Sequence, residues 1–544
     1  MTDSLFDIDA LSAPAGDGEI LIQPSIREMA SCVEAHRHLR PNGGLVLLDR
    51  SAAEWGRDSG ETGPVILTGH QPSFYHPGVW AKQEVAAELA DRIGGSARML
   101  LVDSDVPHPL TLAWPDPSGP TCRVRTSSPA NLPAGQAYEH LTVPDRDGWR
   151  RMFETIERRW SPEGDDLLDP FADGFLNPPN KPDSPAAGYV DRWQAGMRSV
   201  QHRLGAVAPA FLRVGEQFAA GADAADPAAL AFVAHLLLNA GRLAADYNGA
   251  LVDYRARRGI RGRRHPIPDL AIDPDRIETP FWMVHPGHAR QRAFVSLDAS
   301  AGLRLHAGDL AVCQIDPDIL RRDPATALAG GSGGWSIRPR ALAQTMYARL
   351  LACDLFIHGI GGAKYDQITD AIIRAFFGVE PPVYGCVSAT LRLRLPRFNI
   401  SPADLRSARH RARDIRYNPQ RYLTLASDGF DRLDRAPADR SDVTRADLAS
   451  LISQRAEAIE SSRRLRAERR TDRAARRDAF DRIHRSNAAL IATVPRIRED
   501  ADRLLARLTA QFAHDRVAGA REWFFALYPA GSLQALRETL RSAG

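Results

Sequence analysis

Two consecutive strand–helix patterns between residues 63 and 112 constrain the fold of this chain more than any other feature. The apolar run PVILT is typical of a short buried strand, and GHQPSFYHPG after it is rich in turn-forming residues. Apolar residues then recur at helical spacing from Val79 to Ile93, and the next apolar run, ARMLLVDSD, ends in acidic residues. Strands that alternate with helices in this way predict a parallel sheet, and ligands bind at the carboxyl ends of such strands.

The middle of the chain changes character twice. Residues 120–225 are rich in proline and glycine, which indicates inserted material around a helix near residues 190–204. The run ALAFVAHLLLNAGRLAADYNGAL predicts one strong helix, and FWMVHPGHARQRAFVSL predicts two β-strands around a turn. The strand–helix pattern then returns in ALAQTMYARLLACDLFIHGIGGAKYDQITDAIIRAFFG, where a helix leads into a strand, a glycine turn and a second helix. The sequence therefore predicts an α/β fold with a large insertion.

The C-terminal region has a different pattern. Apolar residues recur every three or four positions from Phe480 to Phe512, and a preceding apolar segment runs from Val443 to Ile459. Between them, SSRRLRAERRTDRAARRDA is almost wholly polar. We expect two long helices over residues 443–515, packed as an antiparallel coiled-coil hairpin with its turn inside 461–479, and a kink at Pro495. A solvated helical surface accounts for the arginines, and no aromatic residues interleave with them, so we do not expect nucleic acid as a partner.

Charge and composition exclude several classes of protein. A net charge of only +3 gives no overall attraction to nucleic acid or to an anionic membrane. The longest apolar stretch, Leu230–Ala240, is far shorter than the ~20 residues that span a bilayer, and the first residues lack a signal-peptide pattern. The cysteines have no CxxC spacing, which argues against a disulfide framework or a zinc site: Cys32, Cys122, Cys313, Cys353 and Cys386. We expect a soluble, cytoplasmic protein with no membrane partner.

Lysine is almost absent from this chain. It occurs at Lys82, Lys181 and Lys364, whereas arginine supplies nearly all of the 70 basic residues. A lysine that is kept in such a chain is a candidate for a site that needs a compact ammonium group, because the planar guanidinium cannot replace it. Lys82 and Lys364 each lie beside a glycine-bearing turn, and Lys181 lies in a proline-rich loop where we expect no role. Chance retention is the alternative explanation.

The first candidate site is the turn after the first predicted strand. It contains Gly69, His70, Gln71 and His76 and leads to Lys82 in the following helix. A helix N-terminus presents free N–H groups and a positive dipole end, which suit a phosphate or a carboxylate. The histidines and the lysine would add donors to a developing negative charge. The alternative is that the histidines only cap backbone groups.

The second candidate site is the acidic end of the next strand. Asp103, Asp105 and His108 lie in LLVDSDVPHP. Paired carboxylates at this place could hold magnesium, bind an amine or act as a general base. The alternative is a pair of strand-end acids solvated in a loop.

The third candidate site is HGIGGAKYD, which contains Gly359, Gly361, Gly362, Lys364 and Asp366. Glycines between a strand and a helix let the backbone approach a ligand closely. The segment has neither the spacing of a P-loop nor that of the dinucleotide fingerprint, so it identifies no particular nucleotide.

Two further patterns have competing interpretations. Arg338 and Arg340, in SIRPRAL, could bind an anionic substrate group in bidentate fashion or form structural ion pairs. His285-Pro-Gly-His288 matches the H-x-G-H signature of class I aminoacyl-tRNA synthetases letter for letter. That signature acts at the first strand-to-helix turn, whereas these residues lie between two predicted strands, so we interpret them as a turn.

Taken together, these segments resemble the cysteine-adding enzymes of bacillithiol synthesis, which are distant relatives of class I aminoacyl-tRNA synthetases. TGHQPSFYHPGVWAK resembles their TGQQ turn, and LLVDSDVPHP is similar to their acidic strand end. SIRPRALAQ followed by HGIGGAKYDQITDAIIRAFFG is similar to their arginine-proline segment and GPGE turn, and LYPAGSLQALRETL resembles their closing LFPNGSLQER. Two positions depart from the family: His70 replaces the first glutamine, and a run ending at Lys364 replaces the acid of GPGE.

The resemblance implies a Rossmann-like parallel-sheet core with connecting-peptide-like insertions and a C-terminal coiled-coil hairpin. The core would comprise residues 1–120 and 326–440, the insertion 121–325, and the hairpin with its closing segment 441–544. The implied activity is that of a ligase, which joins cysteine to the amino sugar of glucosaminyl-malate, with ATP or ADP and magnesium as cofactors and a homodimer formed through the coiled coil. The alternative is a non-catalytic protein that binds a nucleotide or an amino acid while its coiled coil docks a partner.

Overall fold

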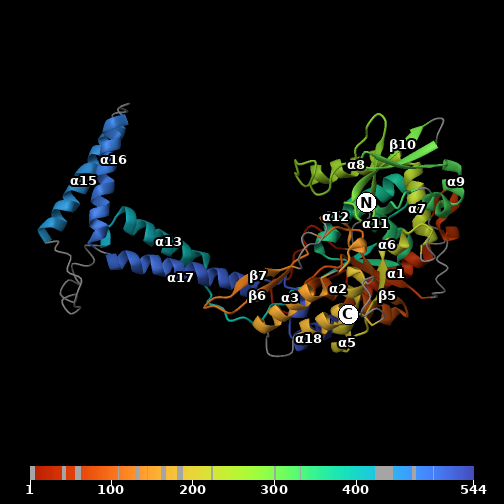
Figure 1. Ribbon diagram of the computed structural model, residues 1–544, viewed down its shortest axis with the longest axis horizontal. Coiled ribbons are helices and arrows are strands. Elements are labelled where there is room, and N and C mark those ends of the chain that lie inside the picture. Colours follow the sequence, from red (N-terminus) through yellow and green to blue (C-terminus); the bar gives the residue numbers. More distant parts are fainter. Residues whose placement is uncertain are drawn as a thin grey trace. The chain divides into compact units, whose positions relative to one another are not determined.

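The chain forms two compact units of mixed α/β secondary structure in the computed structural model (Figure 1). The first unit comprises Met1–Asp116, Val124–Arg394 and Ala520–Gly544, and the second comprises Pro117–Arg123 and Leu395–Gly519. The structure describes residues 6–39, 44–55, 63–107, 110–128, 134–143, 145–160, 167–179, 188–221, 225–298, 302–330, 332–422, 445–467, 473–493 and 495–543. These units divide the chain differently from the four regions expected from the sequence, because residues 124–394 all belong to the first unit.

A six-stranded sheet forms the centre of the first unit, with the strand order β1-β15-β14-β4-β5-β8. The last five strands in this order are mutually parallel, and β1 pairs antiparallel with β15 at the edge. The predicted parallel sheet is therefore confirmed. The strands of this sheet are β1 (Ile20–Gln23), β4 (Val65–His70), β5 (Ser96–Leu101), β8 (Ala210–Arg213), β14 (Leu355–His358) and β15 (Tyr384–Ala389).

Strand β8 was not expected, because it lies in the region that the sequence indicates as an insertion. It has only four residues, and none of them is fully buried. A strand this short at a sheet edge shows too little alternation to be recognised among prolines and glycines. The insertion pattern was therefore wrong for residues 210–213, although the helix expected near residues 190–204 is present as α5 (Tyr189–Arg203).

The link from β4 to α2 (Pro77–Ile93) follows directly from the local sequence. Val65 to Thr68 are all buried, as expected of a central strand covered on both faces. His76 caps the helix by accepting the Gly78 N–H, Pro77 occupies the first helical position, and Gly94 ends the helix in a left-handed conformation with φ of 63°. The turn between β4 and α2 is thus fixed at both ends.

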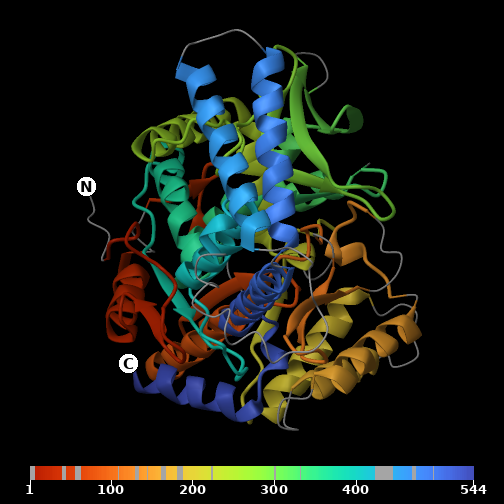
Figure 2. The ribbon, with the colours of Figure 1, turned by 90° about the vertical axis from the view of Figure 1, so that its left-hand side faces the viewer.

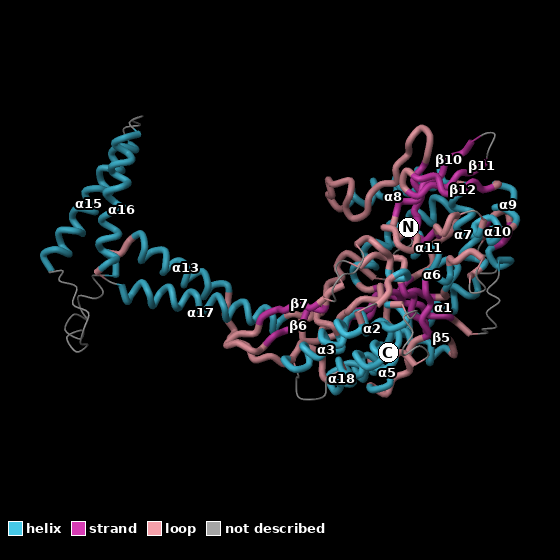
Figure 3. Tube along the Cα trace, in the orientation of Figure 1, coloured by secondary structure: helices cyan, strands magenta, loops and turns pink. Residues whose placement is uncertain are grey.

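A second, five-stranded antiparallel sheet has the order β12-β11-β10-β9-β13 (Figure 3). The two predicted strands around HPGH are confirmed as β9 and β10. The strands of this sheet are β9 (Ile277–Val284), β10 (Gln291–Asp298), β11 (Gly302–Ala307), β12 (Leu310–Ile315) and β13 (Ser336–Pro339), and two small hairpins are formed by β2 (Val46–Leu47) with β3 (Arg50–Ser51) and by β6 (Leu112–Asp116) with β7 (Arg123–Ser127).

One hydrophobic core joins the two larger sheets. It contains Leu67 and Leu100 from the six-stranded sheet, Phe281 and Leu303 from the five-stranded sheet, and Phe232 from α7. The single helix predicted over this region was wrong, because the chain breaks at Asn239 into α7 (Pro227–Leu238) and α8 (Ala240–Arg257), which are bent by 89°. Both helices are apolar, so periodicity alone did not reveal the bend.

The remaining helices surround the two sheets. Among the described residues, no single helix is long and apolar enough to cross a membrane, and one bent pair, α7 with α8, meets that criterion only together. The other helices of the first unit are α1 (Ile26–Leu39), α3 (Arg146–Arg159), α4 (Leu168–Leu176), α6 (Val214–Gln217), α9 (Pro317–Arg322), α10 (Pro324–Ala329), α11 (Ala341–Tyr347), α12 (Ile360–Ile372) and α18 (Ala530–Ser542), with shorter turns η2 (Ala52–Trp55), η3 (Tyr138–His140), η4 (Ala348–Ala352), η5 (Ile373–Phe377) and η7 (Phe525–Leu527).

The second unit is helical. The helices are α13 (Pro402–Tyr417), α15 (Arg445–Ala467), α16 (Arg473–Ala492) and α17 (Pro495–Gly519), and Figure 2 shows α15 and α16 side by side. Arg455 Nε donates to Asn487 Oδ1 at 2.6 Å, and Arg482 donates to Ser461 Oγ at 3.5 Å, so α15 and α16 run antiparallel.

The expectation of two long helices over residues 443–515 was wrong, since three helices cover this range. Pro495 begins a new helix instead of kinking a continuous one, because proline has no N–H to donate and fits the first helical position. Leu490 is buried as expected, but Phe480 is 57% exposed and packs against the His484 ring at a tilt of 50°. The first helix ends at Ala467 and the next begins at Arg473, which agrees with the expected turn interval.

Candidate functional site

Three segments that were singled out from the sequence meet at the carboxyl edge of the six-stranded sheet. The GHQP turn follows β4, the DSD turn follows β5, and GIGG follows β14, and these three strands are neighbours in the order β14-β4-β5. Gln71 Nε2 donates to Asp105 Oδ2 at 2.9 Å, which joins the first two turns. Lys82 Nζ donates to Gly69 O at 2.7 Å, and its Cδ lies 4.0 Å from the position that a Cβ on Gly359 would take. The predicted convergence of the three turns is therefore confirmed.

The two histidines of the GHQP turn are neutral at physiological pH. Burial lowers the pKa of His70 to about 3, and the nearby Lys82 lowers it further. Burial also lowers the pKa of His76 to about 4, with Arg521 and Lys82 as additional causes. His76 Nδ1 accepts the Gly78 N–H at 3.1 Å, so its other ring nitrogen carries the hydrogen. His76 does cap a backbone group, and each ring is a neutral donor rather than a cation.

Lys82 is a buried cation without a carboxylate partner among the described residues. Only 4% of the residue is exposed, and burial lowers the pKa of its ammonium group to about 8. Cys386, on β15, is electrostatically coupled to both Lys82 and Lys364, although burial raises the pKa of the thiol to about 12. The two lysines noted from the sequence, on α2 and on α12, therefore both act electrostatically on the same cysteine. Lys181 lies outside the described residues.

The GIGG segment is a helix start rather than a free loop. Gly359 is the N-cap of α12 with an extended backbone (φ −84°, ψ 171°), and Gly361 and Gly362 lie in the first helical turn. A Cβ on Gly361 would meet no atom within 4 Å, whereas one on Gly362 would lie 2.7 Å from His358 Nδ1. The sequence predicted that these glycines let a ligand approach the backbone closely. The space for such an approach is open at Gly361, whereas His358 occupies it at Gly362.

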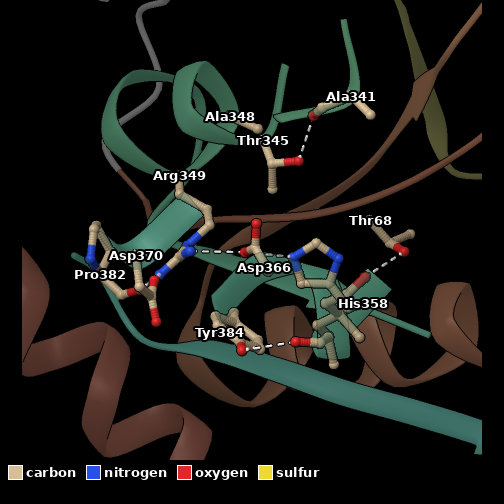
Figure 4. A network of polar contacts seen from close by, with 12 residues as sticks. Thr68, Ala341, Thr345, Ala348, Arg349, His358, Asp366, Asp370, Pro382 and Tyr384 are labelled. Carbon is tan, nitrogen blue, oxygen red and sulfur yellow. Dashed lines mark hydrogen bonds and ion pairs between the residues drawn. The ribbon is translucent and has the colours of Figure 1, made fainter. Parts of the chain in front are cut away.

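Asp366 lies behind this helix start, in a buried ionic network (Figure 4). Its Oδ2 atom is 2.7 Å from Arg349 Nη1 and 2.9 Å from His358 Nε2, and Arg349 Nη2 pairs with Asp370 at 2.7 Å. Burial alone would raise the pKa of Asp366, but Arg349 and His358 outweigh it and lower this pKa to about 2. Asp366 therefore anchors α12 to β14 and η4, a placement that does not match the predicted contact with a ligand.

Asp105 is held by three partners. Its Oδ2 atom accepts from Gln71, and its Oδ1 atom accepts from Arg290 Nη1 at 2.8 Å and from the Val106 N–H at 2.9 Å. Arg290 comes from the β9–β10 turn, and its guanidinium lies 4.0 Å above the Trp282 ring. Asp105 and Gln71 are half-buried, so this edge of the site is preorganised by a charge-assisted network.

Asp103 is almost fully buried, and it lies beside an acid that sequence analysis missed. Its Oδ1 atom accepts the Gly215 N–H at 2.8 Å, and it is 1% exposed. Burial, and then the neighbouring Glu139, raise the pKa of Asp103 to about 7. Glu139 lies in QAYEH, within the proline- and glycine-rich region, and no motif there distinguishes it from a surface acid.

The arginines of SIRPRAL form ion pairs within the protein, which is the arrangement that one of the two interpretations expects. Arg338 binds both carboxylate oxygens of Glu139, at 2.9 to 3.3 Å, and Arg340 pairs with the buried Glu278 at 2.6 Å. Arg338 therefore affects the site indirectly, by holding the carboxylate of Glu139. Both guanidinium groups are engaged by protein carboxylates.

The acidic residues do not fit a magnesium ion as they are arranged. Both oxygens of Asp105 are occupied by nitrogen donors, Asp103 has one oxygen bound to Gly215, and a cation, Arg290, stands where a metal would need oxygen ligands. Within the described ranges, no group of three or more His, Cys, Asp or Glu side chains could hold a metal ion. His108 lies outside the described residues.

The HPGH segment forms the tight turn between β9 and β10. The His288 N–H bonds to His285 O at 3.2 Å, and Gly287 has a φ of +81°, which glycine adopts without strain. The two imidazole rings lie 4.6 Å apart and both pack on Trp335. The interpretation of these residues as a turn is confirmed.

The C-terminal segment supports the GHQP turn from behind. Phe525 stacks on Tyr75 and on Trp80, with ring centroids 5.5 and 6.3 Å apart, and its N–H donates to Tyr75 O. Tyr75 OH is in turn bonded by Gln83. The site thus depends on residues from both ends of the first unit. No family model matches the sequence, and no curated protein matches it either.

Proposed function

We propose that this protein is a ligase-like enzyme that joins the carboxylate of a cysteine-like amino acid to the amine of an amino sugar or a related acceptor. The observation that carries the proposal is the convergence of the GHQP, DSD and GIGG turns at one sheet edge, with a cationic side and an acidic side. The proposal agrees with the resemblance of these segments to the cysteine-adding enzymes of bacillithiol synthesis.

A Rossmann-like core is the finer fold that we propose. Numbered in chain order, the five parallel strands β4, β5, β8, β14 and β15 lie in the spatial order 3-2-1-4-5. This order has a switch point between its first and fourth strands, which here are β4 and β14, and open parallel sheets bind ligands at such points. The GHQP and GIGG turns flank that point.

The cationic side would bind the activated carboxylate or a phosphate. Lys82 contributes a buried ammonium, His76 a neutral N–H donor, and α12 the free backbone N–H groups of its first turn beside the open Gly361. These residues fit the phosphates of ATP or ADP. When bound, the nucleotide would supply the group that makes a carboxyl oxygen leave. Lys82 would stabilise the negative charge that develops on that oxygen.

The acidic side would receive the amine. In the proposed reaction the amine nitrogen bonds to the carboxyl carbon, one carboxyl oxygen leaves with its electron pair on the phosphate, and the nitrogen loses one proton. A carboxylate that is near the nitrogen can take this proton. Gln71 and Arg290 hold Asp105 in place, so the acceptor is oriented against a fixed edge.

We further propose that the helical unit mediates homodimerisation as a coiled coil. The support is the antiparallel pair α15–α16, together with the 57% exposed Phe480 on α16. A cytoplasmic location is proposed from the scattered cysteines, whose spacing contains no CxxC motif.

Ligand binding followed by product analysis tests the proposed activity. ATP, ADP and inorganic phosphate are each added to the full-length protein, and the melting temperature is recorded. A specific ligand at 100 times its Kd adds about 2.7 kcal/mol of stability. Reactions with ATP, cysteine and glucosaminyl-malate are then analysed by mass spectrometry for the amide product. Absence of both the thermal shift and the product, with a protein that melts cooperatively, would exclude this function.

One observation favours a non-catalytic binding protein as the second candidate. Most polar groups of the site already have protein partners: Asp105 has Gln71 and Arg290, and Lys82 has Gly69 O. A sensor of a nucleotide or amino acid needs only a preformed site of this kind. Such a binding protein would show the rise in melting temperature with a ligand, but mass spectrometry would find the ligand chemically unchanged after prolonged incubation.

A further inference from the structure

Three carboxyl groups lie around the end of β5, and two of them have an arginine partner. Asp105 pairs with Arg290, and Glu139 is bound in bidentate fashion by Arg338. Asp103 lies beside Glu139, because the Glu139 N–H donates to Asp103 O at 2.8 Å. Among the described residues, no arginine or lysine forms an ion pair with Asp103. Of the three acids, Asp103 is therefore the one whose charge is not matched by a direct partner.

Gly215 shows how closely Asp103 and Glu139 approach each other. A Cβ on this glycine would lie 2.7 Å from Glu139 Oε2 and 3.2 Å from Asp103 Oδ2, so these two oxygens are at most about 5.9 Å apart. The Gly215 N–H occupies Asp103 Oδ1. The residue as a whole is 1% exposed, and Asp103 Oδ2 has no hydrogen-bond partner in the described part of the chain. An acceptor that no protein donor occupies suits a donor that arrives with a ligand.

We propose that Asp103 Oδ2 takes the proton from the attacking amine, and that Glu139, fixed by Arg338, is the positioning residue that prepares Asp103 for this role. The step transfers one proton from the nitrogen to the carboxylate and leaves the nitrogen's electron pair for the new bond to carbon. This inference rests on the proposed function, and it names a primary amine as the chemical class that this side of the site receives.

The charges that face Asp103 support this assignment. Burial raises its pKa most, and Glu139 raises it further, whereas the Gly215 N–H, Arg338 and Arg213 lower it, with a balance at about 7. A base with a pKa near the working pH is ionised often enough to accept a proton and basic enough to hold it. Glu139 comes from η3, Arg338 from β13 and Arg213 from the end of β8, so three elements set this balance.

Infrared titration of the full-length protein tests the inference without any turnover. A protonated buried carboxyl group gives a carbonyl band, and we expect a band that disappears with a midpoint near pH 7 and is missing in Asp103→Asn. Glu139→Gln removes the neighbouring negative charge, so the midpoint should fall by about one pH unit. Glu380→Gln is the matched control: it removes the same charge from an exposed residue that pairs with Arg374 and not with any group facing Asp103, so it should leave the midpoint unchanged. Equal shifts in both variants, or a band unaffected by Asp103→Asn, would overturn the proposal.

Two further measurements keep the test decisive. If Glu139→Gln does not fold, Glu139→Asp is the substitute. It keeps the negative charge, but its shorter side chain moves the carboxylate away from Asp103, so the titration midpoint should fall by a smaller amount. Methylammonium is then compared with tetramethylammonium, which has the charge but no N–H. Methylammonium should lower the midpoint because an N–H donor stabilises the carboxylate, and no difference between the two would refute the amine assignment. If the carboxyl band titrates as expected but the protein forms no amide, the proposed ligase function is rejected, whereas the role of Asp103 as a proton acceptor is retained.

Discussion

The ionic network around Arg349 and the single charge of Lys82 are both buried, but they are built on different principles. In the network, Arg349, Asp366 and His358 satisfy one another at 2.7 to 2.9 Å. Lys82 is also buried, but it has only Gly69 O as its hydrogen-bond partner among the described residues. The pKa shifts follow this difference, because Asp366 is held ionised, whereas burial lowers the pKa of Lys82 to about 8. Matched charges hold α12, β14 and η4 together, whereas Lys82 has no carboxylate partner among the described residues.

The largest effect is expected from breaking the matched network. Arg349→Met leaves Asp366 and Asp370 buried without their cation, which typically costs about 3–5 kcal/mol of unfolding free energy. Urea denaturation measures this loss. Arg150→Met is the control, since Arg150 pairs with Asp147 on the surface at 2.8 Å and should change stability by less than about 1 kcal/mol. Similar losses in both variants would remove the distinction between the two groups of charges.

The opposite result is expected for the unmatched lysine. Lys82→Met should preserve stability at pH 7, because it removes a buried charge that burial disfavours, but it should lower the ligation rate by about 10²–10³-fold. Lys364→Met tests the second lysine, and Lys181→Met is the control for a lysine of the proline-rich loop. A Lys82→Met protein that is strongly destabilised yet retains nucleotide affinity would show that this lysine is structural.

The pH dependence separates the histidines of the GHQP turn from other groups. His70 and His76 have folded-state pKa values of about 3 and 4, below the ordinary value of 6.5. The unfolded chain therefore binds their protons first as the pH falls below about 6.5, and stability decreases by up to about 1.4 kcal/mol per pH unit and histidine. His70→Gln and His76→Gln should each flatten this slope between pH 6.5 and 4. An unchanged slope in denaturation series at several pH values would contradict the assigned neutrality.

The smallest effects compare two glycines of one helical turn. Gly361→Ala should stabilise the fold by about 0.4–1 kcal/mol, because the added methyl group meets no atom within 4 Å and restricts the unfolded chain. Gly362→Ala should destabilise it, since its methyl group would lie 2.7 Å from His358 Nδ1 of the matched network. Melting temperatures distinguish these signs. If Gly361→Ala also weakens phosphate binding, the backbone of α12 contributes to the ligand site.

The parts of the fold that were predictable are those whose pattern is local. The run PVILT and the turn after it predicted β4 and the start of α2, because burial on both faces and a proline at the first helical position leave direct sequence signals. The bend at Asn239 and the strand β8 were missed. Each depends on packing against distant segments: α7 and α8 are both apolar, and β8 is a four-residue edge strand.

The candidate site shows the same limit. The three turns could be placed at one edge, because parallel strands carry their carboxyl ends together. Sequence could not assign partners, so Asp366 was expected to contact a ligand although it is bonded to Arg349 and His358. Glu139 was missed for the converse reason: its importance comes from its distance to Asp103, 36 positions away in the chain, which no motif records.

The stacking of Phe525 on Tyr75 has a consequence for how the protein is made. The ribosome synthesises Phe525 450 residues after Tyr75, and at roughly 5–20 residues per second this interval lasts on the order of tens of seconds. Throughout that time Tyr75 and Trp80 lack the ring that stacks on them in the folded protein, and exposed apolar surface of this kind recruits chaperones or other nascent chains. Translation speed over the helical unit, which is encoded between the two residues, would thus influence the yield of active protein. Synonymous codons in that stretch could alter the yield without changing a single side chain.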